Sequence, residues 1–485
     1  MLLRFCVTLL CCQATWSMDA NPGLQAKFSP KALAYVKVVL DNHLAQWLTS
    51  VPIEDVHGKT SMSVDVDYDI TDIKMSQFNA SGVDLTFCPG TGIQVSISNS
   101  MAVVNCNWKI SSSLIKDEGS SIMTLQGISV RADLNVTQSS TGVPSITIGK
   151  CQSDVRDVGV ELNGRMQMIQ SLMIEPMKKV TREKMKQELC PMMKEYIKNW
   201  TTGLNKQSFI VDINEDIGID FSLVGNPETT EQCLTIPSKG QFFLKKTKEN
   251  APFSPMPFSL PVQNERMVCV GVSECVLNSA SEAYFRSGAF TLSLDSLLSE
   301  VVINSTGLSK SFPEISNQKC QLTGILRATK APLITLTPGN LSLEASLTVE
   351  LSAILPNQVT KLLVKQDMNI GISGNFSVSS IRSSYTKLNM TGYVTLNRFQ
   401  IQPSVSTKQK QSVAKGKVSE TSKLENSIKT LAEGRVLDMI NDRLGHGISI
   451  PNLPYFPVID PSFKINQGFC SLCGDVQFIP PTPKI

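Results

Sequence analysis

The spacing of apolar residues changes several times along this 485-residue chain, and each change delimits a predicted element. Between residues 163 and 203, apolar side chains recur every three or four positions, which is the spacing of one helical face. The stripe shifts phase once, and its members are Met166, Ile169, Met173, Met177, Val180, Leu189, Met192 or Met193, Tyr196 and Trp200. Pro176 and Pro191 each remove a backbone donor, so we expect a kink or break at each.

A second amphipathic helix is predicted near the start of the chain. Ser29 can cap it, and Pro30 suits its first position. Its apolar stripe ends before Pro52 and consists of Leu33, Val36, Leu40, Leu44 and Trp47. Such a helix cannot bury one face alone, so both helices need a sheet to lie on.

Segments with period-two alternation fill the region between these helices and predict that sheet. Clusters of Gly, Asn and Ser separate the segments, as in an antiparallel meander, with a hairpin turn expected near Asn99. The predicted strands span residues 63–68, 73–78, 83–87, 93–98, 102–108, 123–135 and 145–148.

The second half of the chain repeats this order of elements without matching residues. Four prolines between residues 251 and 261 indicate an extended connector. Before the connector we expect strands at 208–223 and 233–244. After the connector we expect strands at 266–276, 322–398 and 463–478. A short helical piece is expected at 295–302 and a basic loop at 408–423. A late amphipathic helix is expected from Leu424, Ile428, Leu431, Val436, Met439, Ile440 and Leu444.

These patterns predict an α+β protein with two similar domains. The first ten to twenty residues have Arg4, an apolar run at 5–12 and small residues at Ser17 and Ala20, which is typical of a secretory signal. No later stretch reaches about 20 apolar residues, so no membrane span is expected. We therefore expect a signal peptide at 1–20, a first domain at 21–235, a strand and linker at 236–265 and a second domain at 266–485.

Other features agree with a secreted, extracellular protein. Ten of the thirteen cysteines remain after the signal, an even number that suits an oxidising compartment. Seven tripeptides could accept an N-linked glycan, at Asn79, Asn135, Asn199, Asn304, Asn340, Asn375 and Asn389.

Catalytic chemistry has little support in the sequence. His43, His57 and His446 are too scattered for a zinc site, and no nucleophile elbow or phosphate-binding loop occurs. Cys470 and Cys473 have the spacing of a redox pair, but on a strand positions i and i+3 face opposite sides, which favours a structural role. We expect no enzyme activity, no cofactor, no metal and no nucleic-acid partner.

Two cysteine pairs stand out. Cys151 follows a predicted strand and Cys190 lies on the long helix, so a bond between them would fasten helix to sheet. Cys88 and Cys106 flank the hairpin expected near Asn99 and could face each other across it. The pairing of the other six stays open: Cys233, Cys269, Cys275, Cys320, Cys470 and Cys473.

Several segments resemble the family of bactericidal/permeability-increasing protein and lipopolysaccharide-binding protein. The matching positions are 21–24 with Lys27, Ser29, Leu33 and Tyr35, then 252–255, 266–268, Gly271, 278–280, 353–357, 396–398 and 447–451. Residues 147–151 and 189–190 fall where that family has its single shared disulfide. Lys27 and Phe28 depart from it, because the family usually has arginine and an aliphatic residue there.

The resemblance implies a boomerang of two strongly twisted antiparallel barrels, each closed by a long helix, joined by a central sheet. It also implies a phospholipid in an apolar pocket beneath the helices of each domain. In the first domain we expect that pocket to be lined partly by Leu33, Val36, Leu40, Ile169 and Met173. The alternative is that these side chains are ordinary core.

The function implied is that of a secreted lipid-binding or lipid-transfer protein in host defence or at an epithelial surface. One alternative is a lipopolysaccharide-binding antibacterial protein, and others are a protein-interaction module with vestigial pockets and a hydrolase. Residues 21–235 carry 19 basic and 24 acidic side chains, a balance of −5, whereas the rest of the mature chain has 25 and 17, a balance of +8. The predicted hairpin at 96–108 lacks any basic residue before Lys109. An acidic first domain repels anionic lipopolysaccharide, so neutral or zwitterionic lipids are expected as ligands.

Overall fold

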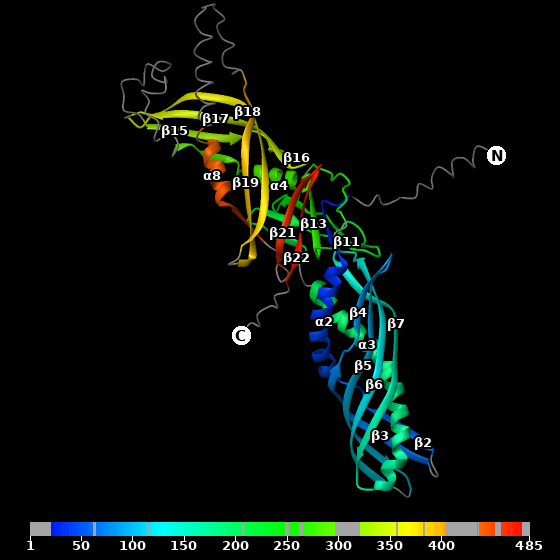
Figure 1. The fold of residues 1–485 in the computed structure, drawn as a ribbon. Coiled ribbons are helices and arrows are strands. Elements are labelled where there is room, and N and C mark those ends of the chain that lie inside the picture. The colour runs from blue at the N-terminus through cyan, green and yellow to red at the C-terminus, as the bar shows by residue number, and fades with distance from the viewer. Residues whose placement is uncertain are drawn as a thin grey trace, which may run out of the picture.

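The protein is an elongated molecule built from two sheet-based halves joined end to end (Figure 1). The computed structural model describes residues 21–61, 65–113, 116–205, 208–247, 252–261, 265–295, 321–355, 357–381, 384–402, 434, 436–451 and 457–477. The predicted signal peptide, Asn304, Cys320 and the basic loop lie outside the described residues.

The first half consists of a long, curled antiparallel sheet with two helices against it (Figure 1). The sheet has the order β2-β3-β5-β6-β7, with β4 paired to β5. Its strands are β2 (Val56–Ser61), β3 (Asp65–Asn79), β4 (Val83–Cys88), β5 (Gly92–Ser111), β6 (Lys116–Gln138) and β7 (Pro144–Asn163), and its helices are α2 (Pro30–Ser50) and α3 (Gln167–Asn205). Along β5 alternate residues such as Val104, Cys106 and Trp108 are buried, so one face of the sheet forms the core.

The second half has a similar sheet and a smaller core. The strands are β14 (Thr291–Ser293), β15 (Gln321–Ala328), β16 (Leu333–Thr337), β17 (Asn340–Ile354), β18 (Thr360–Ile381), β19 (Ser384–Ile401) and β20 (Ile448–Pro451). They pair in the order β14-β15-β17-β18-β19-β20, with β16 beside β17. In the part of this half that the structure describes, the helices are α4 (Glu274–Arg286) and α8 (Leu437–His446).

A six-stranded central sheet joins the halves by pairing strands from distant parts of the chain. Its order is β10-β11-β1-β13-β22-β21, and the strands are β10 (Glu228–Thr229), β11 (Leu234–Ser238), β1 (Leu24–Phe28), β13 (Val268–Ser273), β22 (Phe469–Val476) and β21 (Val458–Asn466). Beside it lies a three-stranded sheet, ordered β12 (Gln241–Leu244), β9 (Ile217–Asp220) and β8 (Ile210–Asp212). Because β1 pairs with β13, the start of the first half is bonded to the start of the second.

The proline-rich connector covers one face of this central sheet. Lys27 Nζ donates to the carbonyl of Leu260 at 2.6 Å, and the ring of Phe258 stacks on Phe469 with centroids 4.8 Å apart. A Cβ at Gly271 would lie 2.5 Å from the Phe258 ring, so only glycine allows the connector to approach this closely.

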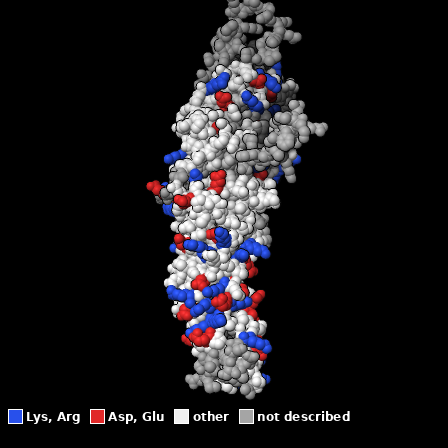
Figure 2. Space-filling model, turned by 90° about the vertical axis from the view of Figure 1, so that its right-hand side faces the viewer, with Lys and Arg blue, Asp and Glu red and all other residues white. Residues whose placement is uncertain are grey.

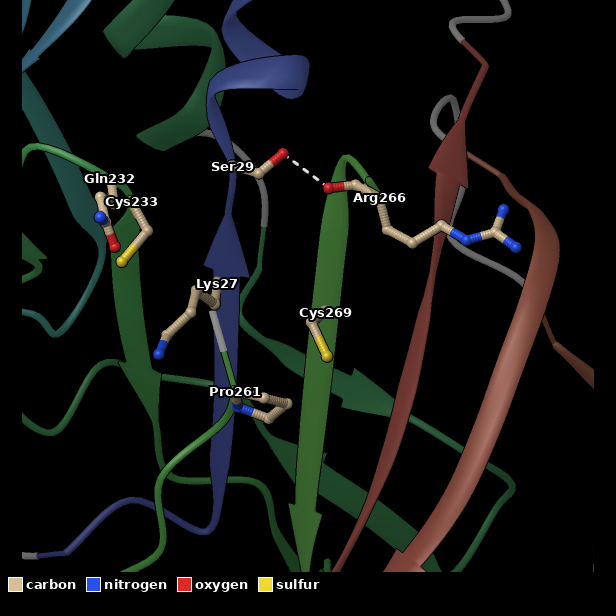
Figure 3. Close-up of a pocket in the computed structure, with 7 residues that line it drawn as sticks. All are labelled: Lys27, Ser29, Gln232, Cys233, Pro261, Arg266 and Cys269. Atoms are coloured by element: carbon tan, nitrogen blue, oxygen red, sulfur yellow. Dashed lines mark hydrogen bonds between the residues drawn. The ribbon is translucent and has the colours of Figure 1, made fainter. Parts of the chain in front are cut away.

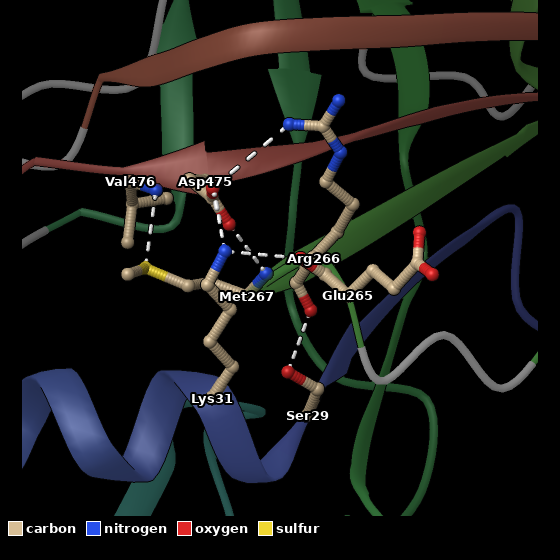
Figure 4. Close-up of polar contacts among 7 residues, drawn as sticks. All are labelled: Ser29, Lys31, Glu265, Arg266, Met267, Asp475 and Val476. Atoms are coloured by element: carbon tan, nitrogen blue, oxygen red, sulfur yellow. Dashed lines mark hydrogen bonds and ion pairs between the residues drawn. The ribbon is translucent and has the colours of Figure 1, made fainter.

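A polar cluster around Asp475 ties helix α2 to the central sheet (Figure 4). The Met267 amide donates to Asp475 Oδ1 at 3.0 Å, and Lys31 Nζ lies 2.8 Å from Oδ2 of the same carboxylate. Ser29 Oγ donates to the carbonyl of Arg266 at 2.6 Å. The first turn of α2, β13 and β22 therefore meet at one carboxylate whose side chain is only 18% exposed.

The hairpin expected near Asn99 is absent, because the two predicted strands are one strand, β5. Asn99 has φ of 51° and lies at a bulge, where the register shifts between Ile97 and Ser100. A bulge inserts one residue and reverses the phase of the alternation, so in sequence it resembles a turn. The turn between β4 and β5 directly follows Cys88, whose partner in the ladder is Gly92.

The helices also differ from the expectations. Helix α3 continues through Pro176 and Pro191 without a break, and Met166 precedes it with 49% of its surface exposed. The buried stripe does not shift phase after Val180, because Thr181 and Met185 continue it. The expected strand at 266–276 ends at Ser273, where helix α4 begins. Of the late amphipathic helix, the described part is α8.

We expect the change Asp475→Ala to lower the free energy of unfolding by about 1–3 kcal/mol, because the Met267 amide loses its acceptor and Lys31 loses its ion pair. Urea unfolding of the full chain measures the loss, and hydrogen exchange at the Met267 amide locates it. The matched control is Asp442→Ala, since the Asp442 side chain is 76% exposed. Unchanged exchange at Met267 would contradict this role of Asp475.

Candidate functional site

Helix α3 lies across the apolar face of the first sheet and buries a stripe rich in methionine. The buried residues of the stripe are Met173, Met177, Thr181, Met185, Leu189, Met192, Met193 and Tyr196. Beneath them lie Met75 and Met123 of the sheet, both almost fully buried. Methionine side chains are flexible and adapt to irregular apolar partners, so this layer can repack around a flexible chain.

One side of α3 is fastened to the edge strand β7 by covalent, ionic and hydrogen bonds. The covalent contact is the Cys151–Cys190 disulfide, with an S–S distance of 2.13 Å. Two ion pairs join Lys186 to Asp154 at 2.7 Å and Arg182 to Asp157 at 3.5 Å. Ser153 Oγ donates to the Lys186 carbonyl at 2.7 Å, and Thr201 Oγ1 donates to the Ile146 carbonyl at 3.0 Å. The hydrogen bond from Lys186 holds the pKa of Asp154 below its usual value.

The other side of α3 faces strands β2 and β3, and a cleft lies between them. Lys184 reaches across to Glu54 at 3.6 Å and also pairs with Glu188 at 2.9 Å. The cleft holds about 380 Å³ and is lined by Val56, Lys59, Tyr68, Pro176, Lys179, Val180, Glu183, Lys184 and Gln187. That volume falls within the range of small-molecule sites in proteins.

The floor of the cleft leads toward the apolar interior. Val56, Val180 and Lys184 line both the cleft and a deeper cavity of about 20 Å³. The deeper cavity is otherwise lined by Ile53, Ile70, Ile73, Val104, Met123, Thr181 and Met185. The Thr181 hydroxyl donates to Met123 Sδ at 2.9 Å, so its polar atom is occupied. The result is a site with a charged mouth and an apolar floor.

The charged mouth contains both signs. The hydrogen bond to Glu188, together with the charges of Glu188 and Glu54, raises the pKa of Lys184 and keeps this amine protonated. Lys179 and Glu183 lie one helical turn apart and both face the cleft. Such a mouth can contact a head group that carries a phosphate and a cationic amine.

Of the five residues expected to line one pocket, Leu33 and Met173 lie in separate hydrophobic clusters. Leu33 packs with Phe87 and Leu234, whereas Met173 belongs to the core beneath α3. Val36 is 43% exposed and Leu40 half-buried, and the side chain of Ile169 lies outside the described residues. Leu33 and Met173 therefore do not belong to one hydrophobic cluster.

The course of the two helices explains this separation. Trp47, near the end of α2, packs on Tyr196 with ring centroids 4.7 Å apart. Met173 lies 23 residues before Tyr196, about 35 Å along the helix axis. The periodicity of the sequence identified the apolar faces of α2 and α3, but it did not determine the position of one helix along the axis of the other.

A second, much smaller space lies at the junction between the halves (Figure 3). It holds about 10 Å³ and is lined by Lys27, Ser29, Gln232, Cys233, Pro261, Arg266 and Cys269. That volume admits one water molecule at most, so this space cannot hold a lipid. Among the described residues, no group of side chains could hold a metal ion and no helix is long and apolar enough to cross a membrane.

Comparison with known families covers most of the chain. The N-terminal domain of the LBP / BPI / CETP family matches residues 32–200, and the C-terminal domain of the same family matches residues 211–478. The chain belongs to this family. The order of elements described above, two curled sheets joined by a central sheet, is the fold implied by the resemblance in sequence.

Individual relatives of the LBP / BPI / CETP family are distant but extend along the full length. The chain is 26% identical to the human BPI fold-containing family C protein, over 95% of this chain and 90% of the relative. It is 24% identical to the lipopolysaccharide-binding protein of Bos taurus, over 96% of this chain and 95% of that relative. A crystal structure of lipopolysaccharide binding protein superposes with a TM-score of 0.58 at 21% identity and covers 95% of this chain and 100% of that one, which shows a shared fold.

The cysteines of this family member form two disulfides among the described residues. Cys151–Cys190 is the pair that the resemblance implies, and Cys269–Cys473 joins β13 to β22 across 204 residues. Cys88 and Cys106 are both free, so the proposed bond between them is wrong. Cys88 lies at the turn into β5, opposite Gly92, whereas Cys106 lies much farther along β5, opposite Ser121 of β6. Burial raises the pKa of Cys106 to about 11, which leaves it unreactive.

The end of the first domain farthest from the central sheet carries basic residues that the sequence alone did not locate there. They are Lys59, Lys109, Lys116 and Arg165. Lys59 pairs with Asp67 at 3.1 Å and Arg165 with Glu118 at 3.6 Å, and Lys109 lies opposite Asp69 and Glu118 in the sheet. On the face in Figure 2, basic and acidic side chains alternate over this domain without forming one basic patch.

Replacing Cys190 with serine should lower the free energy of unfolding by about 3–4 kcal/mol, because the disulfide closes a loop of 39 residues. Denaturant unfolding of the full chain measures this loss. Cys88→Ser is the matched control, since Cys88 is a free, half-buried thiol, and it should cost less than about 1 kcal/mol. Equal stability of the two variants would show that the bond does not fasten α3.

Proposed function

We propose that this protein is a secreted lipid-binding protein that holds a phospholipid-like amphiphile in the cleft between α3 and strands β2 and β3. The single observation that carries the proposal is that this cleft has a charged mouth and an apolar floor. The relatives named for lipopolysaccharide binding support an amphipathic ligand of this kind. A role in innate host defence is part of the proposal and rests on those relatives alone.

Entry of an acyl chain requires the deeper cavity to widen, since it now accommodates little more than one water molecule. Met123 and Met185 line it and can change rotamer at low cost. Helix α3 is fastened at β7, so any outward movement of the helix opens the side facing β2. Each methylene that then leaves water contributes about 0.8 kcal/mol.

The head group expected at the mouth is zwitterionic. Lys179 and Lys184 can contact a phosphate, and Glu183 can contact a cationic amine. Lipopolysaccharide remains the alternative ligand because several relatives are named for it. It is less favoured because Lys59, Lys109 and Arg165, at the far end of this domain, already face carboxylates.

Filling the mouth of the cleft should remove the lipid. The change Val180→Trp adds bulk at a half-buried position that lines both the cleft and the deeper cavity. We expect at least a tenfold weaker affinity for a zwitterionic phospholipid, which corresponds to about 1.4 kcal/mol. Native mass spectrometry of the secreted protein, with analysis of extracted lipids, measures the load.

The control for this experiment is Val211→Trp, at an exposed position of β8 outside the cleft. It should retain the lipid of the unmodified protein. A lipid load that is equal in both variants would place the ligand elsewhere, and a complete absence of lipid in the unmodified protein would favour a protein-interaction module.

Removing carboxylates from the far end of the first domain should create lipopolysaccharide binding. The double variant Asp67→Asn and Glu118→Gln frees Lys59 and Arg165 from their ion pairs and removes one of the two carboxylates opposite Lys109. Charge-assisted bonds to phosphate then become available, and we expect at least a tenfold gain in affinity that weakens steeply with salt. Asp84→Asn, on an exposed position of β4, is the charge control. High, salt-resistant affinity of the unmodified protein would show that lipopolysaccharide is the ligand.

A further inference from the structure

The acceptor tripeptides for N-glycosylation differ in how their asparagines are placed. Among the described residues Asn79, Asn199 and Asn375 are exposed, whereas Asn135, Asn340 and Asn389 are half-buried. Asn340 Nδ2 donates to the Ser342 hydroxyl at 3.2 Å, and the Asn389 side chain fills the space beside Gly447. A bulky glycan needs an amide that points to solvent, so the three exposed asparagines are the better acceptors.

Asn375 has an exposed aromatic neighbour on the adjacent strand. It lies on β18 directly opposite Tyr393 of β19, and residues in such pairs point to the same face with Cβ atoms about 4.5–5.5 Å apart. Tyr393 is 63% exposed. The next cross-strand pair on this face is Ser377 with Thr391, and their Oγ atoms lie 2.8 Å apart. A large ring is thus left in water amid a polar surface, beside an exposed acceptor.

We propose that Asn375 carries an N-linked glycan whose first sugar packs on the ring of Tyr393. The apolar C–H face of a pyranose matches the face of an aromatic ring, and their contact removes apolar area from water. In the transfer step Asn375 Nδ2 loses a proton and bonds to the anomeric carbon of a lipid-linked oligosaccharide, and the lipid diphosphate leaves. The donor and the transferase belong to the secretory pathway, so the inference rests on the secretion included in the proposed function.

The folded sheet also indicates when the sugar is added. The acceptor tripeptide ends at Ser377, whose hydroxyl is bonded to Thr391 once β18 and β19 have paired. Transfer therefore precedes pairing of these strands, and the first sugar meets Tyr393 as the sheet forms. The glycan then stabilises the pair from outside the core.

The test uses the full chain secreted from cells that add high-mannose glycans. Peptide mapping should find Asn375 occupied. The change Asn375→Gln should lower the midpoint of thermal unfolding by about 2–4 °C in the unmodified chain and equally in a Tyr393→Phe background, because both retain the ring. In a Tyr393→Thr background, matched to the neighbouring Thr391 and Thr395, Asn375→Gln should cause no further shift.

Asn199→Gln, on the exposed surface of α3, is the control and should give the same shift in all three backgrounds. Glycans at Asn79 or Asn199 with none at Asn375 would overturn this inference and leave secretion intact. A chain without any glycan would overturn both. If Asn375 is glycosylated but Asn375→Gln lowers the unfolding midpoint equally in the unmodified chain and in the Tyr393→Thr background, the proposed contact with Tyr393 is also overturned.

Discussion

The first domain depends on the attachment of helix α3 to the edge strand β7. The curled sheet has one apolar face, and α3 covers it with a stripe of methionines that would otherwise face water. The Cys151–Cys190 disulfide and the Lys186–Asp154 pair fix this edge. Toward β2 the helix is separated from the sheet by a cleft, bridged by Lys184 and Glu54. The position of the fastening therefore decides on which side the protein can admit a ligand.

The two halves are connected by shared strands, which makes the junction rigid in a way that a flexible linker would not. Strand β1 pairs with β11 on one side and with β13 on the other, so backbone hydrogen bonds cross from one half to the other. Asp475 and the Cys269–Cys473 disulfide reinforce the same place. The cleft under α3 lies well away from this junction, so repacking of its methionines need not disturb the central sheet.

Much of the architecture was present in the sequence as local pattern. Helix α2 begins at Pro30, as predicted, because the fixed φ of proline suits the first helical position. The Ser29 hydroxyl does not cap the helix as expected, because it donates to the carbonyl of Arg266 instead. The long stripe from Met173 to Tyr196 predicted α3 and the face that it buries. These features depend on spacing within one element, so no knowledge of distant partners was needed. The candidate cleft was only partly foreseen, since Val180 was recognised while Thr181, Lys184 and Met185 were not assigned to a site.

What the tertiary structure alone decided are the features that depend on partners far along the chain. Helix α4 buries Asn278, Ser279 and Ser281, and it was missed because these polar residues interrupt the apolar pattern. Their side chains are satisfied by backbone groups of β12, of β16 and of the residue before β16. In the sequence the bulge at Asn99 has the pattern of a turn, and only the pairing of β5 with β3 and β6 shows that the strand continues through it. The partner of Cys269 lies 204 residues away. Period and composition determine which face of an element is buried, whereas register, sliding and pairing are set by contacts that form only when distant segments meet.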